Sequence, residues 1–285
     1  MSDIQKFKLV ADSSGDVKGM KSVAFESAPL RIKTAEREFV DHEEMNVEEM
    51  VTYLRSYKGR SSTSCPNVED WLATFGDAEY VFCVTITATL SGSYNSASTA
   101  KRIYEEQHPG RRVHVINSLS TGPEMKLILE KLEEYILAGL DFDTIVERIT
   151  EYGQSTGLLF LLESLRNLAN NGRVSPLVAN VAGILGIRVL GKASDVGDLE
   201  QLDKCRGSKN ALDAVLRRLG SLGYTGGRLR ISHCLNEGAA GQLASLVIAA
   251  YPGAEIEIYP CRGLCSFYAE RGGLLIGFEK GTPSV

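Results

Sequence analysis

The chain of 285 residues is long enough for one large or two ordinary domains. Hydrophobic residues make up 44% of it and charged residues 24%, a balance typical of a folded globular protein and not of a disordered chain. The net charge of −5, without a basic cluster, argues against nucleic acid as a partner.

The first half of the sequence alternates between apolar, strand-like runs and helical runs. Residues 7–11 predict a strand that ends in the polar turn DSSGD, and residues 28–40 alternate as a half-exposed strand or hairpin does. Asn46 and Asn67 are natural caps for helices over about 46–57 and 67–75, with a hydroxyl-rich loop at 61–67 between them. Further strands are expected over 80–86 and 112–116, and further helices over about 94–106, 122–137 and 141–152. Such alternation predicts an α/β fold with a mainly parallel sheet.

A second half opens with the apolar run at 156–162. We place a domain boundary near Gly153, which divides the chain into an N-terminal domain over 1–153 and a C-terminal domain over 154–285. The elements expected in the second half are a helix around Leu165, a loop at 170–173, an apolar segment at 177–189, helices at 211–222 and 239–250, and strands at 228–234, 255–259 and 274–278.

Hydroxyl groups gather around one glycine in the sequence TLSGS, between the strand at 80–86 and the helix that follows it. Ligands of open α/β sheets bind beyond the carboxyl ends of the strands, and a helix N-terminus favours an anion. Ser91 and Ser93 therefore either hold a negatively charged group or simply cap the helix. The loops at 12–14, 61–64 and 117–118 are further candidates, and Asp12 and Asp16 are possible cation ligands that a polar turn explains equally well.

Most motifs for reaction chemistry are missing from the sequence. It contains no P-loop, no G-x-G-x-x-G and no nucleophile elbow G-x-S-x-G. None of the four histidines lies beside a hydroxyl cluster, and Cys261 and Cys265 have no second pair or nearby histidine to complete a zinc site. We therefore expect no metal and no cofactor. Scattered cysteines, the lack of a signal-peptide pattern and the lack of a run of about 20 apolar residues predict a cytoplasmic protein without membrane insertion.

Eight short stretches, taken together, resemble the DegV family of bacterial fatty-acid-binding proteins. In chain order they are LVADSSGD, STSCP, TLSGSYNSA, VINSLSTG, LRNLANNGRVS, LGIRVLGKA, KCRGSKNA and GGLLIGF. The resemblance implies an N-terminal α/β domain with a parallel sheet, a C-terminal mixed α/β domain and a tunnel for one acyl chain. It also implies a carrier that performs no chemistry itself and presents the carboxylate of a long-chain fatty acid to a separate kinase subunit, which forms an acyl phosphate for phospholipid synthesis.

The same resemblance assigns residues. Thr63 of T-S-x-P and Ser91 of L-S-G are expected to contact the carboxylate, with Ser64 and Gly92 adjacent to them. The family often carries a histidine in a G-T-H-x-G-P-G segment, and the comparable segment here, GLCSFYAERGGLLIGF, places Tyr268 there. Tyrosine can still donate a hydrogen bond, although it does not titrate near neutral pH. Arg173 and Arg206 fall where the family carries arginines linked to the kinase or to the phosphate region, and Ser93 is interpreted as the helix cap.

Two other functions are alternatives to the carrier. One is a serine-dependent acyl hydrolase with Ser91 or Ser93 as its nucleophile, and the other is a sugar- or ketone-handling phosphotransfer domain, which needs a reactive histidine. The number and positions of the histidines make the second the weaker of the two.

Overall fold

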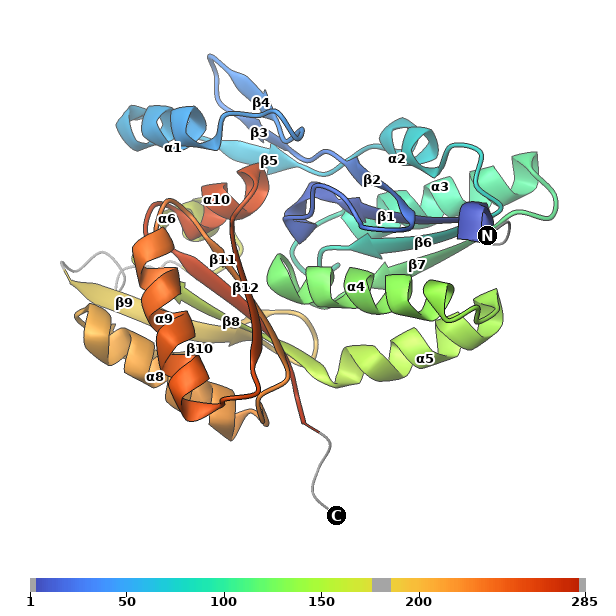
Figure 1. Cartoon of the computed structure of the whole chain (residues 1–285). Coiled ribbons are helices and arrows are strands. Elements are labelled where there is room, and N and C mark those ends of the chain that lie inside the picture. Colours follow the sequence, from blue (N-terminus) through green and yellow to red (C-terminus); the bar gives the residue numbers. More distant parts are fainter. Residues whose placement is uncertain (1–3, 176–185, 282–285) are drawn as a thin grey trace.

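The computed structural model describes residues 4–175 and 186–281, whose strands form three sheets (Figure 1). The first sheet is parallel, has the order β2-β1-β6-β7 and consists of β1 (Phe7–Asp12), β2 (Ala24–Ala28), β6 (Tyr80–Thr85) and β7 (Arg112–Asn117). One face packs against α2 (Val68–Phe75) and α3 (Ser93–Gln107), and the other against α4 (Pro123–Leu137) and α5 (Phe142–Gln154). Because helices cover both faces, the central strand β6 is apolar along nearly its whole length.

The second sheet has six strands in the order β10-β9-β8-β13-β11-β12. They are β8 (Thr156–Leu162), β9 (Ile187–Ala193), β10 (Leu199–Arg206), β11 (Arg228–His233), β12 (Glu255–Pro260) and β13 (Leu274–Glu279). All neighbours are antiparallel except β11 and β12. One face is covered by α8 (Ser208–Ser221) and α9 (Glu237–Ala250), and the short helices α6 (Arg166–Asn170) and α10 (Gly263–Ala269) follow β8 and β12.

The third sheet is small and antiparallel, with the order β4-β3-β5. It consists of β3 (Arg31–Lys33), β4 (Glu38–Val40) and β5 (Ser62–Ser64), and α1 (Val47–Ser56) lies beside it (Figure 1). Ile32 and Met50 share one hydrophobic cluster with Leu158 and Phe160 of β8. The small sheet and α1 therefore pack against the six-stranded sheet.

Helix α4 packs between the two larger sheets (Figure 1). Met125 and Leu129 belong to the core of the parallel sheet, while the start of the helix lies against β13. A Cβ atom on Gly277 would lie 2.5 Å from the carbonyl carbon of Pro123, so this close approach depends on glycine. The packing brings the carboxyl end of β1 to the second sheet, where Ser232 Oγ on β11 donates to Asp16 Oδ2 at 2.9 Å.

Most predicted elements are confirmed, including the helix caps at Asn46 and Asn67. The prediction of a hydroxyl-rich loop at 61–67 was partly wrong, because residues 62–64 pair with β3 as an edge strand. The strand β10 and the helix α10 were not predicted, and most of the apolar segment at 177–189 lies outside the described residues. The strands of the parallel sheet all precede Gly153 and those of the six-stranded sheet all follow it. No helix in the described ranges has the length and apolar character needed to cross a membrane.

Candidate functional site

An apolar cavity of about 270 Å³ lies between the six-stranded sheet, the small sheet and the loop before α3. Its polar wall contains all five residues named above for carboxylate contact, together with one of the two arginines: Thr63, Ser64, Ser91, Gly92, Tyr268 and Arg173. Its apolar wall includes Leu158, Phe160, Leu162, Leu168, Leu199 and Leu275. The polar residues are half-buried or exposed, whereas most of these leucines and the phenylalanine are buried. The cavity is thus polar near the protein surface and apolar in its interior.

Two residues separated by 205 positions meet at the polar wall. Thr63 Oγ1 on β5 and Tyr268 Oη on α10 are 2.7 Å apart. Burial is the main cause that raises the pKa of Tyr268 above its ordinary value, and it outweighs the hydrogen bond with Thr63 and the charge of Arg173. The phenol therefore stays protonated at neutral pH and remains a hydrogen-bond donor.

Arg173 follows α6 and reaches the same wall. Its guanidinium carbon lies 5.9 Å from the centre of the Tyr268 ring, and its Nε donates to the carbonyl of Leu90 at 3.3 Å. A further donor, Nη1, contacts the carbonyl of Asn171. The side chain is held by backbone acceptors on two segments, which fixes a positive charge beside the hydroxyl groups.

The role of Ser93, at the start of α3, differs from the prediction. The helix is capped by Gly92, and Ser91 Oγ accepts from the backbone N–H of Ser93 at 3.3 Å. Ser93 is the first helical residue, is fully buried, and its hydroxyl donates to Asp12 Oδ2 at 2.5 Å. The interpretation of Ser93 as the helix cap was therefore wrong, because its hydroxyl faces a buried carboxylate and not the free N–H groups of the helix.

Asp12 fastens this loop to the end of β1. Its Oδ2 atom also accepts from the backbone N–H of Ile86 at 2.9 Å, and its Oδ1 atom accepts from the N–H of Ser14 at 3.2 Å and from the Ser14 hydroxyl. Burial raises the pKa of Asp12 above its ordinary value, in spite of these donors. The sequence signal for this role was an acidic residue directly after a buried strand. Its oxygens are occupied by protein donors, and across residues 4–175 and 186–281 no cluster of three or more His, Cys, Asp or Glu side chains forms a candidate metal site.

Arg206 is not brought to the cavity. It lies exposed at the end of β10, and its carbonyl accepts from the Asn210 side chain at 3.0 Å. His233 is not among the residues that line the cavity either, and its Nδ1 accepts from the backbone N–H of Asn236 at 3.3 Å. The described residues that line the cavity include no histidine and no carboxylate, so Ser91 has no general base among them.

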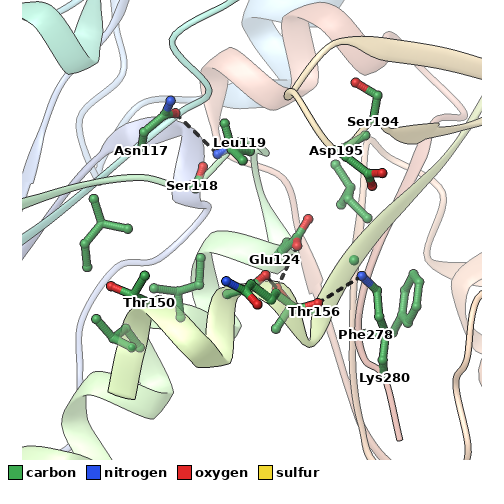
Figure 2. A pocket seen from close by; sticks show the side chains of 18 of the residues that line it. Asn117, Ser118, Leu119, Glu124, Thr150, Thr156, Ser194, Asp195, Phe278 and Lys280 are labelled. Atoms are coloured by element: carbon green, nitrogen blue, oxygen red, sulfur yellow. Dashed lines mark hydrogen bonds between the residues drawn. The ribbon is translucent and has the colours of Figure 1, made fainter. Parts of the chain in front are cut away.

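A larger cavity of about 570 Å³ lies between β7, α4, α5 and the start of β8 (Figure 2). Polar and charged side chains line much of it, and Figure 2 shows Asn117, Glu124, Asp195 and Lys280 around the space. Thr156 Oγ1 donates to Glu124 at 2.7 Å. An acyl chain placed here would remove water from charged groups, which is costly, so this cavity is less suited to an apolar ligand despite its size.

Comparisons with known proteins agree with this architecture. The sequence matches the DegV family, which is described as an uncharacterised protein family, over residues 6–280. A DegV domain-containing protein of Streptococcus pneumoniae is 45% identical over 277 residues, which is 96% of this chain and 99% of that protein.

Two similar crystal structures contain fatty acids. A DegV family protein from Eubacterium eligens loaded with heptadecanoic acid has a TM-score of 0.95 at 45% identity, and the match covers 96% of this chain and 100% of that one. The Streptococcus pneumoniae Fatty Acid Kinase (Fak) B3 protein loaded with linoleic acid has a TM-score of 0.95 at 44% identity, with 96% and 99% covered. The family match over nearly the whole chain and the shared fold lead to one conclusion: this protein belongs to the DegV family.

Proposed function

We propose that this protein binds one long-chain fatty acid in the apolar cavity and presents its carboxylate to a separate kinase, which forms an acyl phosphate for phospholipid synthesis. The observation that carries the proposal is the cavity itself, because apolar walls lead to a cluster of neutral hydroxyl groups without a general base. The fatty acids bound to the Eubacterium eligens and Streptococcus pneumoniae relatives support the choice of ligand.

The acyl chain supplies most of the affinity in this proposal. Burying each methylene contributes about 0.8 kcal/mol, so a long chain contributes on the order of 10 kcal/mol before the cost of ordering it. Each neutral hydrogen bond to the carboxylate adds roughly 1 kcal/mol. The leucine-lined interior therefore sets how tightly the ligand is held, and the polar wall sets its depth and orientation.

The carboxylate is held by Thr63, Ser91 and Tyr268, with Ser64 and the backbone at Gly92 beside them. These donors are uncharged, so they orient the carboxylate without transferring a proton to it. Its oxygen stays available as a nucleophile for the phosphate donor of a kinase. Tyr268 takes the place that the family often gives to histidine and, with its raised pKa, remains a donor over the whole neutral range.

The kinase step rests on the Fak B3 relative, whose name identifies it as part of a fatty acid kinase. Arg173 borders the exposed end of the cavity, where a transferred phosphoryl group would arrive, and Arg206 is an exposed arginine suited to contact with the kinase. We place the carrier in the cytoplasm, where its partner would meet ATP. No stable membrane insertion is required for this exchange.

Mass spectrometry of the denatured, bacterially expressed protein tests the proposal. We expect one co-purified fatty acid per chain. The variant that combines Thr63→Val with Ser91→Ala should exchange its lipid faster at unchanged folding, whereas a control with Thr52→Val and Ser245→Ala, two exposed helical positions, should behave like the parent. Absence of lipid would count against the carrier, and turnover of acyl esters that disappears with Ser91→Ala would favour the hydrolase.

A further inference from the structure

The start of α10 is held by carboxylates that come from distant parts of the chain. Asp41, the residue after β4, accepts from the backbone N–H of Gly263 and of Leu264, each at 2.9 Å. Asp16 accepts from the N–H of Arg262 at 2.7 Å. Asp41 is 1% exposed, so these contacts lie in the interior and are not interchangeable with water.

The side chain of Arg262 adds further contacts to the start of α10. The residue is 5% exposed, and its guanidinium donates to the carbonyl of Val17 at 2.7 Å and to the carbonyl of Asp41 at 2.6 Å. It also lies 3.6 Å from the Asp41 carboxylate, and its Nη1 donates to Ser27 Oγ at 3.1 Å. Arg262 and Asp41 together join the β1–β2 connection, the small sheet and α10.

The contact leaves no spare room. A Cβ atom on Gly263 would lie 2.8 Å from Asp41 Cγ and 2.3 Å from Met45 Cε. The backbone of α10 can therefore approach the carboxylate only because residue 263 is glycine.

The same small sheet also carries the partner of Tyr268. Asp41 follows β4, β4 pairs with β3, and β3 pairs with β5, which contains Thr63. The small sheet thus holds the start of α10 through Asp41. It also contacts the end of α10, where the Tyr268 hydroxyl lies 2.7 Å from Thr63 Oγ1. A shift of the helix start would move the hydroxyl relative to Thr63.

We propose that Asp41, acting together with Arg262, is a positioning residue that sets the Tyr268 hydroxyl at the carboxylate-binding wall of the cavity. This inference rests on the proposed function, since it concerns how the fatty-acid head group is held. Asp41 does not touch the ligand, and its effect on binding passes through Tyr268.

The test is a double-mutant cycle of Asp41→Asn and Tyr268→Phe on the whole protein loaded with deuterated heptadecanoic acid. Exchange against unlabelled acid is followed by mass spectrometry. In Asp41→Asn the amide nitrogen faces the backbone N–H of either Gly263 or Leu264, so one of these hydrogen bonds is lost. We expect the bound fatty acid to exchange about tenfold faster, as for the loss of one hydrogen bond to a charged group. In the Tyr268→Phe background the same substitution should change the rate little.

A purely structural role would give equal factors in both backgrounds, and this result would overturn the proposal. Asp70→Asn serves as the matched control, because the carboxylate of Asp70 pairs with Arg31 of β3 and accepts from the backbone N–H of Asn67 in the capping box of α2. If Asp41→Asn does not fold, Arg262→Lys takes its place in the cycle with the same expectation. A protein that takes up no heptadecanoic acid refutes the proposed function, whereas uptake with additive effects refutes the positioning role alone.

Discussion

Replacing Asp12 by asparagine changes one carboxylate oxygen into an amide nitrogen at the end of β1, where the side chain contacts the loop before α3. Each oxygen of Asp12 accepts from one backbone N–H, Ser14 at 3.2 Å on Oδ1 and Ile86 at 2.9 Å on Oδ2. The amide nitrogen must face one of these N–H groups, whichever way the side chain is turned. Because backbone donors cannot be reversed, one of them is left without an acceptor in the interior.

An unsatisfied buried donor costs about 1–3 kcal/mol, and we expect Asp12→Asn to lower the free energy of unfolding by this amount. Equilibrium unfolding in urea measures it as a lower midpoint at an unchanged m-value. Asp16→Asn is the matched control in the same turn. Asp16 accepts from one backbone N–H, of Arg262, and from the Ser232 hydroxyl, which can rotate to accept from the amide instead.

We therefore expect Asp16→Asn to lie within about 0.5 kcal/mol of the parent when both variants are unfolded near pH 4, where the folded parent keeps its Asp16 carboxyl protonated and thus resembles the amide. Equal losses for the two asparagine variants, or no loss for Asp12→Asn, would refute this account of the turn. The contrast is informative because both residues are buried aspartates only four positions apart.

Three further predictions concern pH, packing and the cavity. Burial raises the pKa of Asp16 to about 7, so the folded state binds this proton more tightly than the unfolded state. The contribution of Asp16 to the free energy of unfolding should therefore fall as pH rises from about 4 to 7 and then level off. Asp16→Asn should remove this pH dependence. The same pH dependence of stability in the variant and the parent would show that Asp16 is not its source. Gly277→Ala should destabilise the fold by about 1–3 kcal/mol, because its Cβ would lie 2.5 Å from the carbonyl carbon of Pro123. Thermal unfolding would show this loss as a lower Tm. An unchanged Tm would show that α4 can move away from β13. Leu199→Trp should fill part of the apolar cavity and shift the co-purified fatty acids to shorter chains, measured by mass spectrometry, and an unchanged chain-length distribution would exclude Leu199 from the acyl path.

The strongest local patterns in the sequence predicted the corresponding elements. The apolar strand at 80–86, the capped helices after Asn46 and Asn67, and the hydroxyl-rich corner before α3 all depend on neighbouring residues, which the sequence shows directly. The family resemblance then selected Thr63, Ser91 and Tyr268, and the fold brings all three to one cavity.

The parts that were missed depend on contacts between distant residues. The helix α10 is short, its sequence GLCSFYA has no side-chain cap, and the Asp41 carboxylate that holds its start lies more than 200 positions away. Strand β10 reads LEQLDKCR, which is mostly polar because it lies at the edge of its sheet. The direction of the Ser93 hydroxyl could not be read locally either, since its acceptor Asp12 is 81 residues earlier.

The most direct test of the central claim is a crystal structure of the protein loaded with heptadecanoic acid. We expect an acyl chain in the cavity lined by Leu158 and Phe160, with its carboxylate within hydrogen-bond distance of Thr63 and Ser91. An acyl chain found instead in the larger cavity beside Glu124 would contradict it.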